Sequence, residues 1–362
     1  MGFIGSHTVD KLVSEGYETV VLDNLEKQVH GTRKPPFQNK RAKYMAGDIR
    51  SPKAWLKALV GVDAVIHLAA AVGVGQSFWQ ARKYTQVNVV GTATLFELLT
   101  KEEKLRKRIR KIVVASSKSI YGEGAYLCKQ HGLLYPDERK IEQLKRKEWE
   151  VKCDICGKET LPAGIPESKP AQNLNPYALS KYATERLSLS YSKTLGIPTV
   201  AFRYFNVYGP RQSLSNPYTG VLAIFISRLK NGNAPVMFED GQQQRDFIFV
   251  DDVASANVTA LDKGEGAFNL GTGRTTSLLK MSSLISGAMG VDMAPQVTGE
   301  FRPGDNRHDF ADVSLYHRVF GERNVTNIEK GIEILVEWSN DIRAVDKFLK
   351  EESQRVKYLA AR

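Results

Sequence analysis

The strongest chemical signal in the sequence is a tyrosine and a lysine placed four residues apart, as Tyr177-x-x-x-Lys181. In a helix, residues with this spacing lie one above the other on the same face. A lysine ammonium beside a phenol stabilises the phenolate, so we expect Lys181 to lower the pKa of Tyr177 and make it a general base. Ser116 and Ser117 follow the apolar run KIVVA, which predicts a buried strand. They therefore stand at the carboxyl end of that strand, where open α/β sheets bind their ligands.

A second group of residues has the spacing of a metal site. Cys128-x-x-His131 is followed, after 21 residues, by Cys153-x-x-Cys156. Two such paired knuckles suit a tetrahedral structural zinc, in which four protein ligands leave no open position for chemistry. The alternative is three unrelated thiols and a surface histidine. Three cysteines, an odd number in a chain of this length, do not indicate a disulfide framework.

The N-terminal segment carries part of a dinucleotide-binding pattern. Gly2 and Gly5 precede an amphipathic stretch, which is followed by an apolar run and then Asp23. In such a fold, glycines let the backbone approach a pyrophosphate, the helix N-terminus supplies N–H donors, and an acid after the second strand binds the adenosine ribose. A carboxylate there favours NAD over NADP, because it would repel a 2′-phosphate. The usual pattern has an apolar strand and a first glycine upstream, and we expect the sheet to lose a central strand without them.

Short apolar runs alternate with amphipathic stretches over the first two-thirds of the chain, which predicts βαβ units and a parallel, doubly wound Rossmann-type sheet. The predicted strands are 19–22, 64–68, 111–115 and 199–205, and the predicted helices are 6–15, 84–99, 177–195, 221–231 and 251–262. A capped terminal helix is predicted to begin near Thr326, which has capping-box spacing to Glu329. We divide the chain into a dinucleotide-binding domain (1–122 and 170–210), a charged, strand-poor, zinc-ribbon-like insertion (123–169) and a smaller C-terminal α/β lobe (mainly 211–362).

Composition narrows the classes of protein. The 362 residues are 42% hydrophobic and 25% charged, which excludes a disordered or collagen-like chain. No apolar run is long enough to span a bilayer and the N-terminus lacks signal-peptide order, so we expect a soluble, cytoplasmic protein without membrane partners. The net charge is +11, and basic residues concentrate at 101–111 and 33–43. These runs lack interleaved aromatic residues, so solvated surfaces are expected rather than nucleic-acid binding.

Taken in order, these and further segments identify a family. The chain resembles the NAD-dependent nucleotide-sugar epimerase/dehydratase family of extended short-chain dehydrogenases/reductases, including its UDP-glucose 4-epimerase-like and dTDP-L-rhamnose 4-epimerase-like members, some of which carry a similar insertion. The matching segments are GFIGSH, GDI at 47–49, HLAA at 67–70, NVVGT at 88–92, SSKSIYG at 116–122, NPYALSK at 175–181, FRYFNVYGPRQ at 202–212, RDFIFVDD at 245–252 and RPGDNRHDFAD at 302–312. They occur in family order from end to end.

The resemblance implies a role for particular residues. It places the active-site Ser117, Tyr177 and Lys181 at the nicotinamide. It places the pyrophosphate and adenosine of NAD against Gly2, Gly5, Asp23, Asp48 and Ile49, and the rest of the cofactor along Leu68, Ala69 and Ala70. The diphosphate and base of a nucleotide sugar would meet Asn206, Arg245, Arg302 and Asp305. A guanidinium fork matches phosphate oxygens, so arginines suit this position.

The resemblance also separates the family's reactions. Sugar dehydratases of this family carry an Asp-Glu pair after the active-site Ser or Thr, whereas this chain has Lys118 and Ser119. Because that turn offers no carboxylic acid to protonate a leaving hydroxyl, 4-epimerisation through a transient 4-keto sugar is expected. The alternatives are a dehydratase or reductase of the same family, or a non-catalytic NAD- or RNA-binding member. The family further implies a homodimer through two helices, one of them carrying Tyr177.

Overall fold

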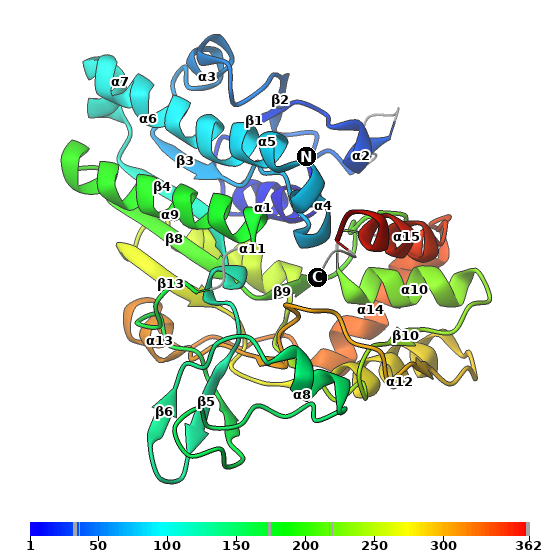
Figure 1. Cartoon of the computed structure of the whole chain (residues 1–362). Coiled ribbons are helices and arrows are strands. Elements are labelled where there is room, and N and C mark those ends of the chain that lie inside the picture. The colour runs from blue at the N-terminus through cyan, green and yellow to red at the C-terminus, as the bar shows by residue number, and fades with distance from the viewer. Residues whose placement is uncertain (32–34, 36, 173–174, 217, 219, 360–362) are drawn as a thin grey trace.

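The computed structural model describes residues 1–31, 35, 37–172, 175–216, 218 and 220–359. Its centre is a parallel sheet of four strands in the order β13-β8-β4-β3 (Figure 1). These strands are β3 (Ala64–His67), β4 (Lys111–Ser117), β8 (Thr199–Tyr204) and β13 (Gly266–Leu270). Three of them were predicted from the continuous apolar runs of the sequence. The Rossmann-type α/β fold is therefore confirmed.

Two further strands form a separate parallel sheet. β1 (Val20–Asp23) pairs with β2 (Lys43–Ala46) and not with β3. Residues of both β1 and β3 line the same large cavity. The expectation of a missing central strand stays a prediction, but β1 and β2 do form a sheet separate from the four central strands.

Helices cover both faces of the central sheet, and alternate side chains of β4 show which helices pack where. Ile112 and Val114 pack in a core with α3 (Pro52–Ala58), α6 (Gly91–Lys101) and α9 (Pro176–Leu195). Val113 and Ala115 pack on the other face with α11 (Val250–Thr259), α13 (Ser314–Phe320) and apolar residues of α1 (Phe3–Ser14). Burial of β4 on both faces explains its uninterrupted apolar run.

The predicted helix 84–99 is interrupted in the structure. It comprises α5 (Ala81–Tyr84), a π-helix (Thr85–Val90) and α6. Within the π-helix, the Asn88 side chain donates to the Ser180 hydroxyl of α9 at 2.8 Å and to the Ala71 carbonyl at 3.0 Å. This bulge therefore ties the Tyr177 helix to the loop after β3. The short helices nearby are α2 (Lys27–His30), α4 (Val74–Trp79) and α7 (Glu103–Arg108).

The C-terminal lobe has a core of its own. Its helices are α10 (Val221–Lys230), α12 (Leu278–Met289) and α14 (Ile328–Asn340), which pack around buried side chains such as Phe225, Met281 and Leu335. Its short strands are β9 (Asn206–Tyr208), β10 (Val236–Met237), β11 (Gln244–Arg245), β12 (Phe247–Phe249), β14 (Thr276–Ser277), β15 (Gln296–Val297) and β16 (His308–Asp309). A further helix, α15 (Phe348–Leu359), follows α14. The predicted terminal helix is thus not the last one.

The predicted cap of α14 is also wrong by one residue. Asn327 is the N-cap, and its side chain accepts hydrogen bonds from the amides of Glu329 at 2.9 Å and Lys330 at 3.4 Å. Thr326 is instead bound through its amide and hydroxyl to Asp252 of α11, at 2.8 and 3.2 Å. The Thr326 side chain, which the sequence spacing predicted to cap α14, therefore binds a residue of another helix instead.

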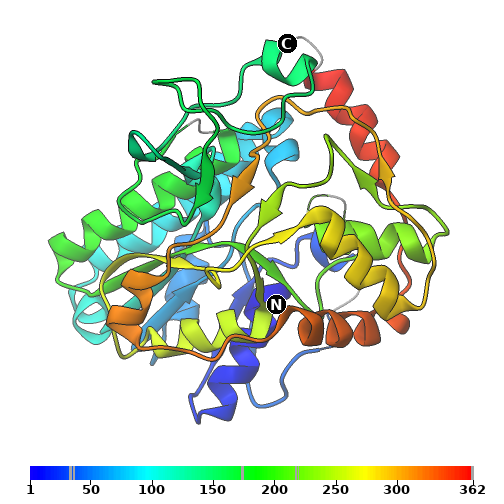
Figure 2. The ribbon, with the colours of Figure 1, turned by 90° about the horizontal axis from the view of Figure 1, so that it is seen from below.

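The insertion folds as a small three-stranded antiparallel sheet, so it is less poor in strands than expected. Its order is β6-β5-β7, with β5 (Ala125–Cys128), β6 (Gly132–Leu134) and β7 (Leu161–Ala163). It is preceded by a 3-10 turn (Lys118–Tyr121) and contains α8 (Ile141–Lys145). Seen from below, it lies beside the chain segment around residues 300–312 (Figure 2).

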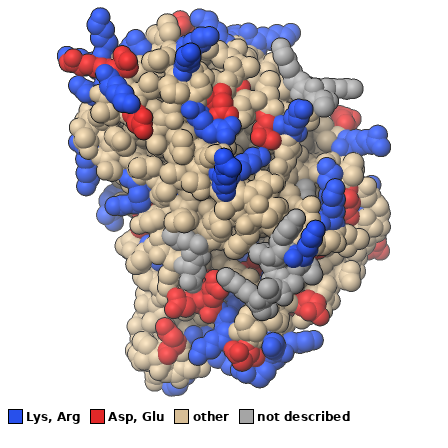
Figure 3. Space-filling view, turned by 45° about the horizontal axis from the view of Figure 1, so that its top comes forward, with Lys and Arg blue, Asp and Glu red and all other residues tan. Residues whose placement is uncertain are grey.

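The basic run at 101–111 is partly neutralised where it lies. Ion pairs join Lys101 to Glu97 at 3.5 Å and Lys107 to Glu103 at 2.7 Å, both at i,i+4 spacing. Figure 3 shows acidic side chains interspersed among the basic ones on the face it presents. The second run falls partly on 33–34 and 36, which lie outside the described residues. Among the helices that the structure describes, none has the length and apolar character needed to cross a membrane.

Candidate active site and metal centre

The candidate catalytic and cofactor residues surround one cavity of about 1720 Å³. Its lining includes the carboxyl ends of β1, β3 and β4, the edge at which α/β sheets bind ligands, and it also extends along β1 and β3 to residues that precede them, such as Glu18 and Asp63. The structure brings twelve predicted residues to its wall: Gly2, Gly5, Asp23, Asp48, Ile49, Leu68, Ala69, Ala70, Ser117, Tyr177, Lys181 and Asn206. Residues from three distant parts of the sequence therefore meet in one place.

The start of α9 fixes the position of Tyr177. Asn175 caps the helix by accepting from the Ala178 amide at 2.9 Å, and Pro176 occupies the first turn, where its missing N–H costs nothing. The Tyr177 amide donates to the Ser77 hydroxyl at 3.1 Å. The Tyr177 ring meets the edge of the buried Tyr84 ring at 6.2 Å between centroids. Tyr177 is thus held by groups from α4 and α5 as well as by its own helix.

Burial dominates the electrostatics of the Tyr177 and Lys181 pair. It raises the pKa of Tyr177 above 10, while hydrogen bonding by Ser117 acts in the opposite direction. Burial lowers the pKa of Lys181 from 10.5 to about 8. The expectation that Lys181 lowers the tyrosine pKa is therefore wrong for the protein alone, because removing both groups from water disfavours the phenolate and the ammonium alike.

A buried ion pair behind the site joins α9 to the sheet. Glu185, two turns after Tyr177, accepts from Arg203 of β8 at 2.6 and 3.0 Å and from the Ser116 hydroxyl at 2.7 Å. Glu185 is fully buried, and Arg203 is nearly so. This contact sets the helix that carries the tyrosine against the strand that delivers Ser117. No sequence pattern indicates this contact, because Glu185 lies 18 residues from Arg203 and 69 residues from Ser116.

The cofactor end of the cavity has the features of an anion and ribose site. Gly2 is the N-cap of α1 and makes no side-chain cap, and the first turn of α1 contains no acidic residue. The helix N-terminus therefore presents backbone N–H groups to the cavity. Asp23 accepts from the Met1 ammonium at 2.8 Å and from the Leu25 amide at 2.7 Å. Burial acts to raise the pKa of Asp23, but His30 and the Met1 ammonium hold it well below its usual value.

The neighbouring Asp48 is held by local contacts. Arg50 donates two hydrogen bonds to its carboxylate, at 2.9 and 2.7 Å, and lowers the pKa of Asp48 to about 2. Ile49, the next predicted contact, is 6% exposed, and its carbonyl accepts from the Trp55 indole at 2.7 Å. The loop after β2 is therefore ordered by contacts to its own flanking residues.

Three of the four predicted substrate residues do not line the cavity. Arg302 pairs with Glu352 of α15 and lies over the Phe238 ring, with 3.9 Å from guanidinium to centroid. Arg245 engages the carbonyls of residues 306 and 307. Asp305 is exposed. In this arrangement, the residues predicted to bind a diphosphate are occupied by contacts within the chain.

From the sequence, Lys118 matters only because it stands where dehydratases carry an acid. The structure shows that its side chain also makes a specific contact. Lys118 follows Ser117 directly and lines the cavity. Its ammonium lies 2.6 Å from the carboxylate of Asp309. The Asp309 side chain is 1% exposed, and its carboxylate also lies 3.3 Å from the Arg245 guanidinium. Burial lowers the pKa of Lys118, and Asp309 opposes that shift. A sequence pattern could not find this contact, because 191 residues separate the partners.

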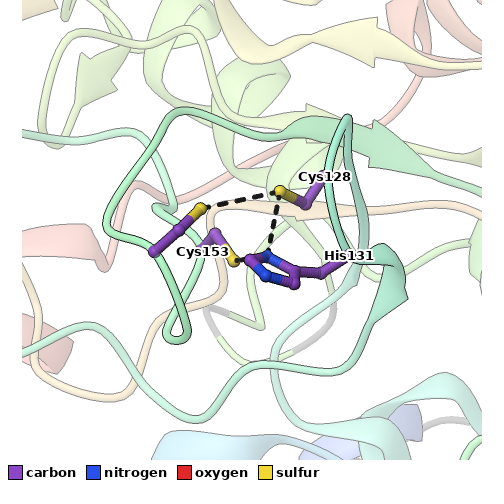
Figure 4. A group of neighbouring side chains, drawn as sticks. Cys128, His131 and Cys153 are labelled. Atoms are coloured by element: carbon purple, nitrogen blue, oxygen red, sulfur yellow. Dashed lines mark hydrogen bonds between the residues drawn. The ribbon is translucent and has the colours of Figure 1, made fainter.

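The four predicted metal ligands converge in the insertion (Figure 4). The Sγ atom of Cys128 lies 3.6 Å from Nδ1 of His131 and 3.9 Å from Sγ of Cys156. The Sγ atom of Cys153 lies 3.4 Å from the same histidine nitrogen. Zinc bonds of about 2.3 Å to sulfur and about 2.0 Å to nitrogen place tetrahedral ligands about 3.5–3.8 Å apart. These three distances are close to those values, and all four donor atoms lie within 4.8 Å of one another, so the group could hold a zinc ion.

Comparisons with known proteins agree with this geometry. A profile of the NAD dependent epimerase/dehydratase family matches residues 154–271, and one of GDP-mannose 4,6 dehydratase matches residues 1–136. The chain is 34% identical to dTDP-L-rhamnose 4-epimerase of Burkholderia thailandensis, covering 93% of this chain and 92% of that one. It is 31% identical to a putative UDP-glucose 4-epimerase of Methanocaldococcus jannaschii, covering 93% and 95%.

Solved structures give the same result. A UDP-glucose 4-epimerase from Thermotoga maritima, crystallised with UDP-glucose, has a TM-score of 0.74 and 28% identity, covering 93% of this chain and 95% of that one. The similarity thus extends over more than nine-tenths of this chain and of each of these relatives. The chain belongs to the NAD-dependent epimerase/dehydratase family.

Proposed function

We propose that the chain is an NAD-dependent epimerase of nucleotide-diphosphate sugars that inverts the sugar at C4 through a transient 4-keto sugar. The observation that carries this proposal is that Ser117, Tyr177 and Lys181 line the same cavity as the dinucleotide residues. Relatives named as 4-epimerases cover more than nine-tenths of the chain. A similar UDP-glucose 4-epimerase from Thermus thermophilus, with a TM-score of 0.72 and 27% identity, was crystallised with NAD.

Each catalytic side chain has one task in this reaction. The bound dinucleotide supplies acceptance of a hydride from C4 and its return to the opposite face of the sugar. Tyr177 accepts the proton of the C4 hydroxyl and later returns it. Ser117 hydrogen-bonds the reacting oxygen. Lys181 holds the phenol and the nicotinamide ribose in place.

The remaining wall residues divide into two binding regions. We assign the pyrophosphate and adenosine to Gly2, Gly5, Asp23, Asp48 and Ile49, and the path towards the nicotinamide to Leu68, Ala69 and Ala70. We assign the diphosphate and base of the sugar nucleotide to Asn206, Arg245, Arg302 and Asp305. Because the Glu352 carboxylate pairs with the Arg302 guanidinium, a diphosphate must displace that carboxylate to reach the guanidinium.

The turn after Ser117 favours epimerisation over dehydration. Lys118 and Ser119 occupy the two places, and the nearby carboxylate of Asp309 is paired with the Lys118 ammonium. A dehydratase would need a carboxylic acid to protonate the departing hydroxyl. Product mass separates the two reactions, because epimerisation leaves the mass unchanged and dehydration removes one water.

Replacement of the proposed base tests the assignment. Tyr177→Phe should lower turnover of UDP-hexose or TDP-hexose substrates by at least about a hundredfold, the usual scale of general-base catalysis, while bound NAD detected by mass spectrometry stays at the wild-type level. Tyr191→Phe, on the same helix and stacked on Phe96, should retain activity. Full turnover by the Tyr177 variant would refute the mechanism.

We also propose that Cys128, His131, Cys153 and Cys156 hold a structural zinc ion. Backbone hydrogen bonding from Gln130 helps to lower the pKa of Cys128 to about 6, which favours the thiolate that metals bind. With four protein ligands, the ion would cross-link the two knuckles of the insertion and supply no catalytic chemistry. Cys153→Ser should lower the zinc content of the purified protein, and an unchanged content would refute the site.

We propose a homodimer that buries α6 and α9. Leu179 of α9 and Val90 of the adjoining π-helix are large apolar side chains that are 54% and 46% exposed. Light scattering should give a mass near twice 40.4 kDa, and Leu179→Glu should shift it towards one chain. A monomeric wild-type protein would refute this arrangement.

A further inference from the structure

The insertion touches the C-terminal lobe through two short stretches of chain, each leading directly from a metal-site cysteine. The first is β5, in which Tyr126 precedes Cys128 by two residues. Tyr126 is 1% exposed, and its hydroxyl accepts from the His308 amide at 3.2 Å and donates to Glu123 at 2.8 Å. The end of β5 is therefore attached to the backbone of β16.

The second stretch precedes Cys153 by three residues. The Glu150 carboxylate accepts from Nε of Arg307 at 3.0 Å, and its other oxygen lies 2.9 Å from Nε2 of His308. Arg307 is fully buried. Both stretches therefore contact His308, and the Glu150 stretch also contacts Arg307.

The opposite side of this segment contacts Arg245, which does not line the cavity, and Lys118, which does. Arg245 donates to the carbonyls of Arg307 at 2.9 Å and Asn306 at 2.7 Å. Asp309, the next residue along β16, pairs with Arg245 at 3.3 Å and with Lys118 at 2.6 Å. Lys118 follows the candidate catalytic serine and lines the cavity, so Asp309 connects this segment to the cavity wall.

We propose that Glu150 is a positioning residue, through which metal occupancy of the insertion controls affinity for the nucleotide sugar. The inference rests on the proposed function. A metal ion that clamps Cys128 and Cys153 fixes the two attached stretches, and these hold residues 306–309, which in turn orient Arg245 and Lys118. The cofactor residues on α1 and β1 lie on the opposite side of the molecule from the insertion (Figure 1). Loss of the metal should therefore weaken substrate binding and leave NAD binding intact.

Glu150→Gln is a suitable perturbation because Arg307 keeps other partners. Glu239 and Asp240 lie 3.0 and 2.7 Å from its Nη1. The variant therefore leaves no unpaired buried charge and should fold. Glu142→Gln in α8 of the same insertion is the matched control, because Glu142 is exposed. Tyr126→Phe provides a second variant, which removes the hydroxyl contact of the other stretch.

The full-length protein is titrated with UDP and with TDP by calorimetry, while zinc and bound NAD are measured on the same samples. We expect Glu150→Gln to lower the affinity for whichever of UDP and TDP binds more tightly by about tenfold, the scale of one charge-assisted contact. The zinc and NAD contents of the protein should not change. Tyr126→Phe should weaken it less, and Glu142→Gln should not change it. A KM for the turned-over sugar that rises more than kcat falls would agree.

Chelation decides whether metal and Glu150 act together. Removal of zinc should weaken diphosphate binding by the wild-type protein by the same factor as Glu150→Gln does. It should not weaken binding by the Glu150→Gln variant any further, as expected if zinc and Glu150 act through the same contacts. Additive effects, an unaffected Glu150→Gln, a loss of NAD together with zinc, or purified protein without zinc would each overturn the inference while leaving the epimerase assignment intact. Failure of every form to bind either diphosphate would overturn the proposed substrate class as well.

Discussion

Replacement of Lys181 by methionine should abolish catalysis and yet stabilise the fold. The lysine is 4% exposed, and burial lowers its pKa from 10.5 to about 8. Keeping its ammonium inside the folded chain costs free energy relative to water. At 1.36 kcal/mol for each pH unit between the two pKa values, this cost is about 3 kcal/mol at neutral pH.

The pH dependence gives the sign of the effect. The unfolded chain keeps the Lys181 proton up to pH 10.5, whereas the folded chain releases it near pH 8. Between these values the unfolded state binds more protons, so the contribution of this group to stability rises with pH. The penalty is therefore complete below pH 8 and absent above pH 10.5. A methionine has similar volume and no charge, so the variant should gain about 3 kcal/mol at neutral pH and nothing at the alkaline limit.

Urea unfolding of the dinucleotide-free wild type and Lys181→Met proteins, repeated across this pH range, measures the difference directly. Lys280→Met, which removes an exposed lysine of α12, is the control and should show little difference at any pH. A Lys181→Met protein that is less stable than wild type at neutral pH would refute the reasoning. So would a stabilisation that does not change with pH, because it would arise from packing and not from the charge.

Three other substitutions test separate parts of the structure. Glu185→Gln should lower the free energy of unfolding by about 3–5 kcal/mol, because it leaves the buried Arg203 guanidinium without its carboxylate; a loss below about 1 kcal/mol in urea unfolding would contradict this. Glu352→Gln should tighten UDP or TDP binding about three- to tenfold in calorimetry by releasing Arg302, and unchanged affinity would show that the ion pair does not compete. Asn327→Ala should lower the free energy of unfolding by about 1 kcal/mol, as expected for loss of a helix cap. An unchanged free energy would show that the Asn327 side chain does not stabilise the helix N-terminus.

The sequence was sufficient where the signal is local or periodic. β4 was predicted from an uninterrupted apolar run, because burial on both faces removes the alternation that a solvated strand would show. The convergence of Cys128, His131, Cys153 and Cys156 was predicted from pair spacing, because each knuckle is a turn of four residues whose ends must meet. The same argument explains why the Tyr177 and Lys181 pair was found: four residues in a helix set the geometry without help from the rest of the fold.

The sequence was insufficient where a distant residue decides the outcome. The cap of α14 was misplaced because Asp252, in another helix, binds Thr326. Arg302 was expected to be available to a phosphate, but a carboxylate 50 residues later pairs with it. Spacing along a helix also says nothing about burial, and burial reverses the expected shift of the Tyr177 pKa.

That reversal has a consequence for catalysis. In the protein alone, burial disfavours both the Tyr177 phenolate and the Lys181 ammonium, so it opposes the deprotonation that the proposed mechanism requires of Tyr177. A positive charge placed beside the phenol would lower the tyrosine pKa, and an oxidised nicotinamide carries such a charge. Proton removal would then be favoured only when the dinucleotide is present to accept the hydride. In the proposed mechanism, burial of the pair, which costs stability, would thus couple deprotonation of the sugar to the presence of the dinucleotide.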